Sequence, residues 1–374
     1  MDMFCNCIIF ADNYWLKSMK LHIFNPEHDI ALAYNRPHLT MPHTVQVLRN
    51  SLGWIPALWA GENDLVLVAD VNSARNASFR FRKRMKNITF VSTSDLKDYD
   101  IDAVDPWGWD ITIKTELMES GVREDLLPSN ERLESIRNLS NRRNTSVVLN
   151  ELCNGEYWMC GESTYIQSVN DLMGLLKEQK NIVAKVPWSS SGRGIRYITD
   201  GDMTDSTMGF LSRTIQLQGG IMVEPYYPKV IDFGMEFVAK KDGSIDFVGV
   251  SLFKTERAAY AGNVIASEDE KLLYLSQYLS LDNQVEPVIN RICQFFPQLM
   301  KDVYEGPFGV DMMIVSRPEK NGFLLHPCVE INVRRTMGHV ALDLFKNSPS
   351  ACPYLMYLEH NTSCYFRIRK LQYM

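Results

Sequence analysis

Two apolar segments near the C-terminus each carry an acid at a position where a metal ion could be held. Residues 308–315 contain Asp311, and residues 324–333 contain Glu330 and Asn332. Side chains alternate between the two faces of a strand, so Glu330 and Asn332 share one face. An Asn-Gly pair between the segments is typical of a hairpin turn. We expect the hairpin to bring Asp311 opposite Glu330, where hard oxygen ligands suit Mg²⁺.

The residues that follow separate this interpretation from its alternative, a surface hairpin with an ordinary acidic face. Arg334 and Arg335 come directly after the second segment. Guanidinium groups beside metal-binding carboxylates are suited to gripping a phosphate that is already bound to Mg²⁺. The combination favours a site for a metal-bound phosphate.

A second segment also indicates phosphate binding. Residues 181–187 are typical of a short buried strand with Lys185 pointing off it, and residues 195–199 of a return strand. The connecting loop is small and polar: Ser189, Ser190, Ser191, Gly192, Arg193 and Gly194. Backbone amides and Ser hydroxyls in such a loop can face phosphate oxygens, and Gly permits close approach. The loop is neither a P-loop nor a dinucleotide fingerprint, and on its own it would be no more than an ordinary loop.

A third segment breaks a strand with an acid and two aromatic residues. Residues 220–227 end in Glu224, Tyr226 and Tyr227, and the strand expected over 231–239 carries Asp232 and Glu236. Backbone groups exposed at such a break can recognise an adenine edge, and an acid on the next strand can bind ribose hydroxyls. The alternative is a hairpin with an interdomain bend.

In this order the segments resemble the ATP-grasp superfamily, over about residues 127–344. The resemblance implies an α/β chain. A Rossmann-like domain precedes a two-lobed grasp of mixed α and β structure, with ATP and Mg²⁺ between the lobes. We expect a pre-grasp domain at 19–126, a small lobe at 127–222 and a large lobe at 223–374. Residues 1–18 are expected to be either a loose extension or a segment included because the translation start was assigned too early.

The resemblance also implies a role for each motif. Lys185 is similar to the lysine that binds the α and β phosphates, and residues 189–194 to the loop that covers them. Glu224, Tyr226 and Tyr227 resemble the adenine hinge, and Glu236, or alternatively Asp232, the ribose acid. Asp311, Glu330 and Asn332 resemble the Mg²⁺ ligands, and Arg334 the arginine beside the transferred phosphate. A second phosphate-binding basic residue is expected earlier, where Arg142 and Arg143 are both candidates.

The N-terminal part alternates strands and helices from Met19, which predicts a parallel sheet. Its first strand is followed by the polar turn 25–29, so Asn25 and His28, with Arg335, are candidates for substrate binding. The alternative for this turn is helix capping by Asn25 or Asp29. Trp107 and Trp109 form either a domain-docking plug, which we favour, or an aromatic pocket wall.

The overall composition limits which binding partners and which cellular compartment we expect for this protein. The 374 residues carry a net charge of −6, so the overall charge does not favour binding to nucleic acid or to an anionic membrane. The eight Cys form no CxxC pair, which suits a reducing cytoplasm. Apolar runs stay below the ~18 residues needed to span a bilayer. We expect small-molecule carboxylate and amine substrates, and a homo-oligomer is compatible with the sequence.

The resemblance implies an ATP-dependent ligase that activates a carboxylate as an acylphosphate for attack by an amine or thiol. Two alternatives stay open: a phosphotransferase on a hydroxyl acceptor, and a non-catalytic nucleotide-binding protein. The sequence does not identify the substrates.

Overall fold

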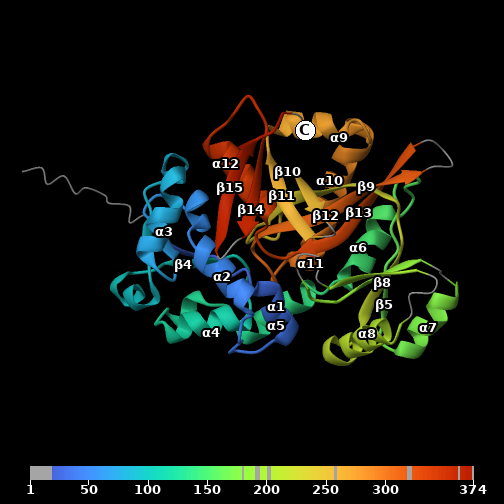
Figure 1. The fold of residues 1–374 in the computed structure, drawn as a ribbon, viewed down its shortest axis with the longest axis horizontal. Helices are drawn as coiled ribbons and strands as arrows, with labels where there is room; N and C mark the ends of the chain where they lie inside the picture. The colour runs from blue at the N-terminus through green and yellow to red at the C-terminus, as the bar shows by residue number, and fades with distance from the viewer. Residues whose placement is uncertain are drawn as a thin grey trace, which may run out of the picture.

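The structure is a computed structural model that describes residues 19–178, 181–189, 194–199, 204–256, 259–317, 322–360 and 363–372. The N-terminal extension expected over residues 1–18 lies outside this range. Figure 1 shows a domain of parallel strands, a large central sheet and a smaller lobe beside it. No helix in these ranges combines the length and the apolarity that crossing a bilayer requires.

The N-terminal domain is built on a parallel sheet in the order β3-β2-β1-β4. The strands are β1 Lys20–Ile23, β2 Leu65–Leu67, β3 Thr89–Val91 and β4 Ala103–Pro106, and the helices between them are α1 His28–Tyr34, α2 His43–Leu52 and α3 Val71–Ser78. Leu21, Ile23, Leu65 and Leu67 are buried, as expected for strands covered on both faces. The alternating pattern therefore predicts this sheet correctly.

Three helices lead from this domain into the grasp: α4 Ile111–Glu119, α5 Asn130–Leu139 and α6 Asn144–Cys153. The small lobe follows as an antiparallel sheet in the order β5-β8-β6-β7. Its strands are β5 Thr164–Ile166, β6 Ile182–Lys185, β7 Ile195–Ile198 and β8 Ile221–Pro225, with helices α7 Val169–Glu178 and α8 Asp205–Gln218. Strand β8 runs across the boundary expected at residue 222, so this sheet extends to Pro225.

The large lobe is an antiparallel sheet in the order β13-β12-β9-β10-β11-β14-β15. Its strands are β9 Lys229–Ala239, β10 Ile245–Glu256, β11 Ala259–Ile265, β12 Gly306–Arg317, β13 Gly322–Asn332, β14 Tyr354–His360 and β15 Cys364–Lys370. Its helices are α9 Glu268–Leu275, α10 Glu286–Phe295, α11 Pro297–Met300 and α12 Met337–Asn347. A capping box made by Ser267 and Glu270 begins α9.

The packing of apolar side chains divides the molecule differently from the sheets. The strands β14 and β15 and helix α12 share a core with the N-terminal domain, through Trp54, Phe81, Leu344 and Phe366. The small lobe has a separate core between its own sheet and helices, which includes Leu172, Leu211 and Ile221. The large lobe and the N-terminal domain are therefore joined by apolar burial that the small lobe does not share.

Candidate active site between the lobes

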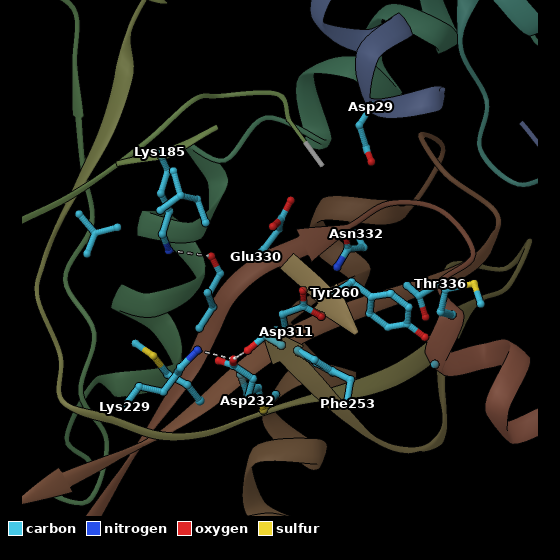
Figure 2. A pocket seen from close by; sticks show the side chains of 18 of the residues that line it. Asp29, Lys185, Lys229, Asp232, Phe253, Tyr260, Asp311, Glu330, Asn332 and Thr336 are labelled. Carbon is cyan, nitrogen blue, oxygen red and sulfur yellow. Dashed lines mark hydrogen bonds and ion pairs between the residues drawn. The ribbon is translucent and has the colours of Figure 1, made fainter. Parts of the chain in front are cut away.

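One cavity of about 840 Å³ lies where the three parts meet. Side chains from β12 and β13 form its floor, β6 and β8 of the small lobe form one wall, and Pro26 and Asp29 belong to the wall from the N-terminal domain. Figure 2 shows Lys185 on one side, Asp311 and Asn332 at the floor, and Asp29 on the other side. All three parts of the chain therefore contribute to a single site.

The two acids face each other as the hairpin pattern predicts. Asp311 on β12 pairs in register with Glu330 on β13. Burial, and then the negative charges of Glu330 and Glu236, raise the pKa of Asp311 to about 8, although a hydrogen bond with Asn332 opposes the shift. A raised carboxyl pKa indicates that negative charge at this point is not fully compensated by the protein.

Two carboxylates and one amide oxygen make an incomplete metal site by themselves. No group of three or more His, Cys, Asp or Glu side chains suited to a metal ion occurs in the described part of the chain. Mg²⁺ is commonly held by one or two carboxylates together with substrate phosphates and water. The uncompensated charge at Asp311 and the oxygen-only donor set of Asp311, Glu330 and Asn332 fit such an ion.

A buried basic side chain reaches the acids from the turn before α6, the helix that packs on the large-lobe core. Arg142, which is buried, donates from Nη2 to Glu330 at 2.6 Å and from Nη1 to the Ser189 hydroxyl at 2.6 Å. Among the residues that the structure describes, the side chain of the neighbouring Arg143 donates to Asn138 alone, at 3.4 Å. Of the two candidates for the second phosphate-binding residue, the structure therefore places Arg142 at the site.

Lys185 lies on the wall of the cavity and is also paired with an acid. Its Nζ is 2.5 Å from Glu224 Oε2, and it donates to the carbonyl of Val329 at 3.4 Å. The loop that follows closes at its base, where Val186 N donates to the carbonyl of Gly194 at 2.9 Å. The loop residues Ser190, Ser191, Gly192 and Arg193 lie outside the described residues.

The hinge predicted at 224–227 connects β8 to β9. Glu224 is buried beside Lys185, whereas Tyr226 is about half exposed, and both Tyr226 and Tyr227 line the cavity. The ring of Tyr227 packs edge-on against His326 with 5.3 Å between the centroids. The segment thus forms the rim of the cavity between the two sheets.

Of the two candidate ribose acids, one is held by contacts with other side chains of the protein. Glu236 Oε2 accepts from the Thr336 hydroxyl at 2.8 Å and lies 3.0 Å from His339 Nδ1, at the start of α12. A Cβ at Gly338 would lie 1.9 Å from Glu236 Oε1, so only glycine allows this packing. Asp232 lies nearer the hinge, where it pairs with Lys229 at 2.5 Å and accepts from Thr255 at 3.0 Å.

This arrangement was compared with known proteins. No protein-family model matches the sequence, and no curated protein matches it. Solved structures do match. N5-carboxyaminoimidazole synthetase from Staphylococcus aureus, in complex with ADP, is 12% identical and aligns over 92% of this chain and 83% of its own, with a TM-score of 0.52. A biotin carboxylase–beta-gamma-ATP complex from Campylobacter jejuni is 13% identical over 92% of this chain and 76% of its own, with a TM-score of 0.52.

The chain has the ATP-grasp fold. At these identities the likeness establishes the architecture of the two lobes and the preceding domain. It does not assign the reaction, which has to be argued from the residues in the cavity.

Arg334 joins the ATP-grasp lobes to the N-terminal domain. Its Nη2 donates to Asp29 Oδ2 at 2.9 Å, and its Nε lies 3.2 Å from both oxygens of that carboxylate. Burial opposes ionisation of Asp29, but the charge and hydrogen bonds of Arg334 together with the nearby His28 and Arg142 outweigh it, so the pKa of Asp29 is lowered. The sequence indicates the turn that contains Asp29 but not this residue, because its partner is 305 positions away.

The other substrate residues expected in the N-terminal domain do not line the cavity. Asn25 and His28 are buried and both bond to Asp110, at 3.2 Å and 2.9 Å, while Asp110 caps α4. They hold the domain together because Asp110 needs donors in an apolar setting. Trp107 does line the cavity, whereas Trp109 packs into the cores of the domain and the large lobe.

Arg335 is likewise a connector. Its guanidinium lies 4.4 Å from the Trp59 ring centroid, 3.4 Å from Asp343 and 3.7 Å from Asp105. These partners come from the N-terminal domain and α12. The side chain therefore fixes α12 against that domain and does not border the cavity.

Proposed function

We propose that the chain is an ATP-dependent ligase that activates a carboxylate through an acylphosphate. The observation that supports this proposal is the meeting, in one cavity of an ATP-grasp fold, of Asp311, Glu330 and Asn332 with Lys185 from the small lobe, while Arg142 bonds to Glu330 beside the cavity. Phosphoryl transfer depends mainly on positioning and charge neutralisation, and this set supplies both.

Each side chain has a place in the proposed mechanism. Lys185 exchanges Glu224 for a phosphate of ATP, and Arg142 holds Ser189 of the covering loop while neutralising Glu330. Tyr226 and Tyr227 border the adenine, and Asp232, which is free of the α12 contacts that occupy Glu236, accepts from the ribose hydroxyls. Asp311, Glu330 and Asn332 would hold Mg²⁺, which neutralises charge on the ATP phosphates when bound.

The chemical step requires no protein nucleophile. A substrate carboxylate oxygen forms a bond to the γ-phosphorus while the bond from that phosphorus to the bridging oxygen breaks, and the electron pair leaves with ADP. An amine or thiol then attacks the acyl carbon and inorganic phosphate departs. Arg334, beside the acids, orients the incoming carboxylate.

Two measurements test the proposal. Calorimetric titration with Mg²⁺ and a non-hydrolysable ATP analogue should show binding, and ATP with a panel of carboxylic acids in hydroxylamine should yield hydroxamates together with ADP. Hydroxylamine intercepts an acylphosphate, so the natural acceptor need not be known. A stable phosphoester would instead identify a phosphotransferase, and nucleotide binding without turnover would identify a non-catalytic protein.

A further inference from the structure

The cavity continues past the acids to a wall supplied by the N-terminal domain. The described residues of that domain that line it are Phe24, Pro26, Asp29, Leu48 and Trp107. Four of the five are apolar, and Met337 and Leu358 of the large lobe add to the same lining. Phe24 and Trp107 pack edge-to-face with 5.0 Å between the centroids, so this wall is rigid. A ligand group placed here would be apolar.

The one charged group in this wall, Asp29, is paired with Arg334. Both side chains are mostly buried, at 18% and 14% exposure, and the two closest atoms are 2.9 Å apart. Figure 2 shows Asp29 pointing from the N-terminal domain toward the side of the cavity that carries Glu330 and Asn332. The pair therefore lines the same cavity as the acids and the apolar wall.

A ligand that binds at this pair must satisfy both of its charges. A simple carboxylate that took Arg334 would leave Asp29 buried without its cation, and a simple amine that took Asp29 would leave Arg334 unpaired. Leaving one member of a buried pair uncompensated is strongly unfavourable. A zwitterion replaces both partners at once, since it carries an anion and a cation a few bonds apart.

The rest of the lining restricts the side chain of such a zwitterion. Among the described residues that line the cavity, the basic side chains are Lys185, Lys229 and Arg334, and each already faces an acid. A second charge on the ligand, directed at Phe24 and Trp107, would be desolvated without a partner. An apolar side chain would bury its surface there at no such cost.

We propose that the acid activated at this site is an α-amino acid with an apolar side chain. Its carboxylate binds Arg334 on the side of Asp311 and Glu330, and its ammonium group binds Asp29. Its side chain packs against Phe24, Leu48 and Trp107. The assignment rests on the proposed ligase function and names its substrate class.

The test measures hydroxamate and ADP with Mg²⁺-ATP, hydroxylamine and one acid at a time. L-Phenylalanine and L-leucine should exceed L-glutamate and L-lysine in kcat/KM by at least about tenfold. 3-Phenylpropanoate, which lacks only the ammonium group of phenylalanine, should also fall by at least about tenfold, because a site built for a polar group rejects the analogue that lacks it.

Two variants sharpen the assignment. Asp29→Asn should remove most of the preference for phenylalanine over 3-phenylpropanoate. Leu48→Lys places a cation at the apolar wall and should raise glutamate relative to leucine. Val47→Lys is the matched control, because Val47 lies on the same helix, is also half-buried and does not line the cavity; the wild-type preference should persist in it.

Failure of this inference is distinguishable from failure of the ligase proposal. If hydroxamates form but charged or des-amino acids react as well as phenylalanine, the amino-acid assignment is overturned and the ligase function stands. If the ATP analogue binds but no acid reacts, the amino-acid subsite is tested by calorimetry with millimolar L-phenylalanine on the complex with the analogue. Binding that Asp29→Asn abolishes supports the subsite. Absence of binding rejects it. Absence of nucleotide binding by the folded protein rejects both proposals.

Discussion

The two junctions that border the cavity are built in different ways. The N-terminal domain joins the C-terminal strands through a shared apolar core, in which Trp54 stacks on Phe81 at 5.0 Å and both rings pack edge-on against Phe366 at 5.8 and 5.4 Å. The small lobe keeps its own core. It meets the rest of the molecule at the cavity through polar contacts, from Arg142, just before α6, to the Ser189 hydroxyl and from Lys185 to the carbonyl of Val329.

This difference indicates which wall of the cavity moves. Separating the N-terminal domain would expose large aromatic surface, so Asp29 stays fixed relative to Arg334. The polar contacts of Lys185 and Arg142 can be exchanged for phosphate oxygens at little net change in free energy. We expect the small lobe to open and close over the nucleotide, while the wall proposed to bind the side chain of the amino acid stays rigid.

The largest expected effect is on the shared core. Phe366→Ala should destabilise the N-terminal domain and the C-terminal strands together, by about 3–5 kcal/mol, because it leaves a cavity among aromatic rings. Leu172→Ala, a truncation inside the small-lobe core, is the comparison. Hydrogen exchange followed by mass spectrometry should show faster exchange in β1–β3 and β15 for the first variant, and in β5–β8 for the second. Spread of the Leu172→Ala effect into β15 would mean that the lobes unfold as one unit.

The next effect concerns the floor of the cavity. Glu330→Gln keeps the shape of the side chain but removes a charge, and turnover should fall by at least about a hundredfold, or 2.7 kcal/mol. The substitution loses the ion pair with Arg142 but also relieves the repulsion between Glu330 and Asp311. Because these two effects oppose each other, the fold should persist. Steady-state ADP release and thermal unfolding are measured together. Full activity would reject the metal site, and collapse of the fold would make Glu330 a structural acid.

A smaller effect should separate the two neighbouring arginines. Arg142→Lys keeps the charge but cannot bridge Ser189 and Glu330 with one planar fork, so kcat/KM for ATP should drop about tenfold, or 1.4 kcal/mol. Arg143→Lys should leave it unchanged, because that side chain faces Asn138. Equal losses in the two variants would remove Arg142 from the phosphate site.

The smallest effect is a pH dependence measured without metal or nucleotide. Because the pKa of Asp311 is raised to about 8 in the folded chain and is about 4 when unfolded, folding takes up a proton between these values. Its contribution therefore makes stability fall as pH rises through this window, by at most about 1.4 kcal/mol per pH unit. Asp311→Asn lacks the contribution, so its advantage in melting temperature over the wild type should grow from pH 5 to pH 8 and then level off. A constant difference between the two proteins would show that the Asp311 carboxyl is not perturbed.

The sequence predicts the parts of the site that lie within one hairpin or one loop. The pairing of Asp311 with Glu330 follows from alternation and a turn, both local properties, and the structure confirms it. Lys185 stays on the cavity wall as expected, because its strand and its loop are adjacent in the chain.

Contacts between distant segments could not be predicted in this way. Asn25 and His28 have the polarity of ligands, but Asp110, on another element, takes up their hydrogen bonds. Glu236 matches the position of a ribose acid in a motif, but Thr336 and His339 reach it from α12. Asp29 shows the opposite: the sequence does not mark it as a site residue, and its place in the proposed site follows from its pairing with Arg334. Periodicity carries no information on such pairings because they depend on how the sheets dock.

The core shared by the first and last segments of the chain also bears on biosynthesis. Cys364 N donates to the Ser51 hydroxyl across 313 positions of sequence, and the aromatic cluster around Phe366 spans a similar interval. At roughly 5–20 residues per second, a ribosome needs about fifteen seconds to a minute to cover that distance. Once β4 has been synthesised, the parallel-sheet domain is complete in sequence but still lacks the strands that cover Trp54 and Phe81. A nascent chain with this topology presents an aromatic surface to chaperones until its last strand emerges, and a truncation that removes β15 should turn that transient exposure into a permanent one.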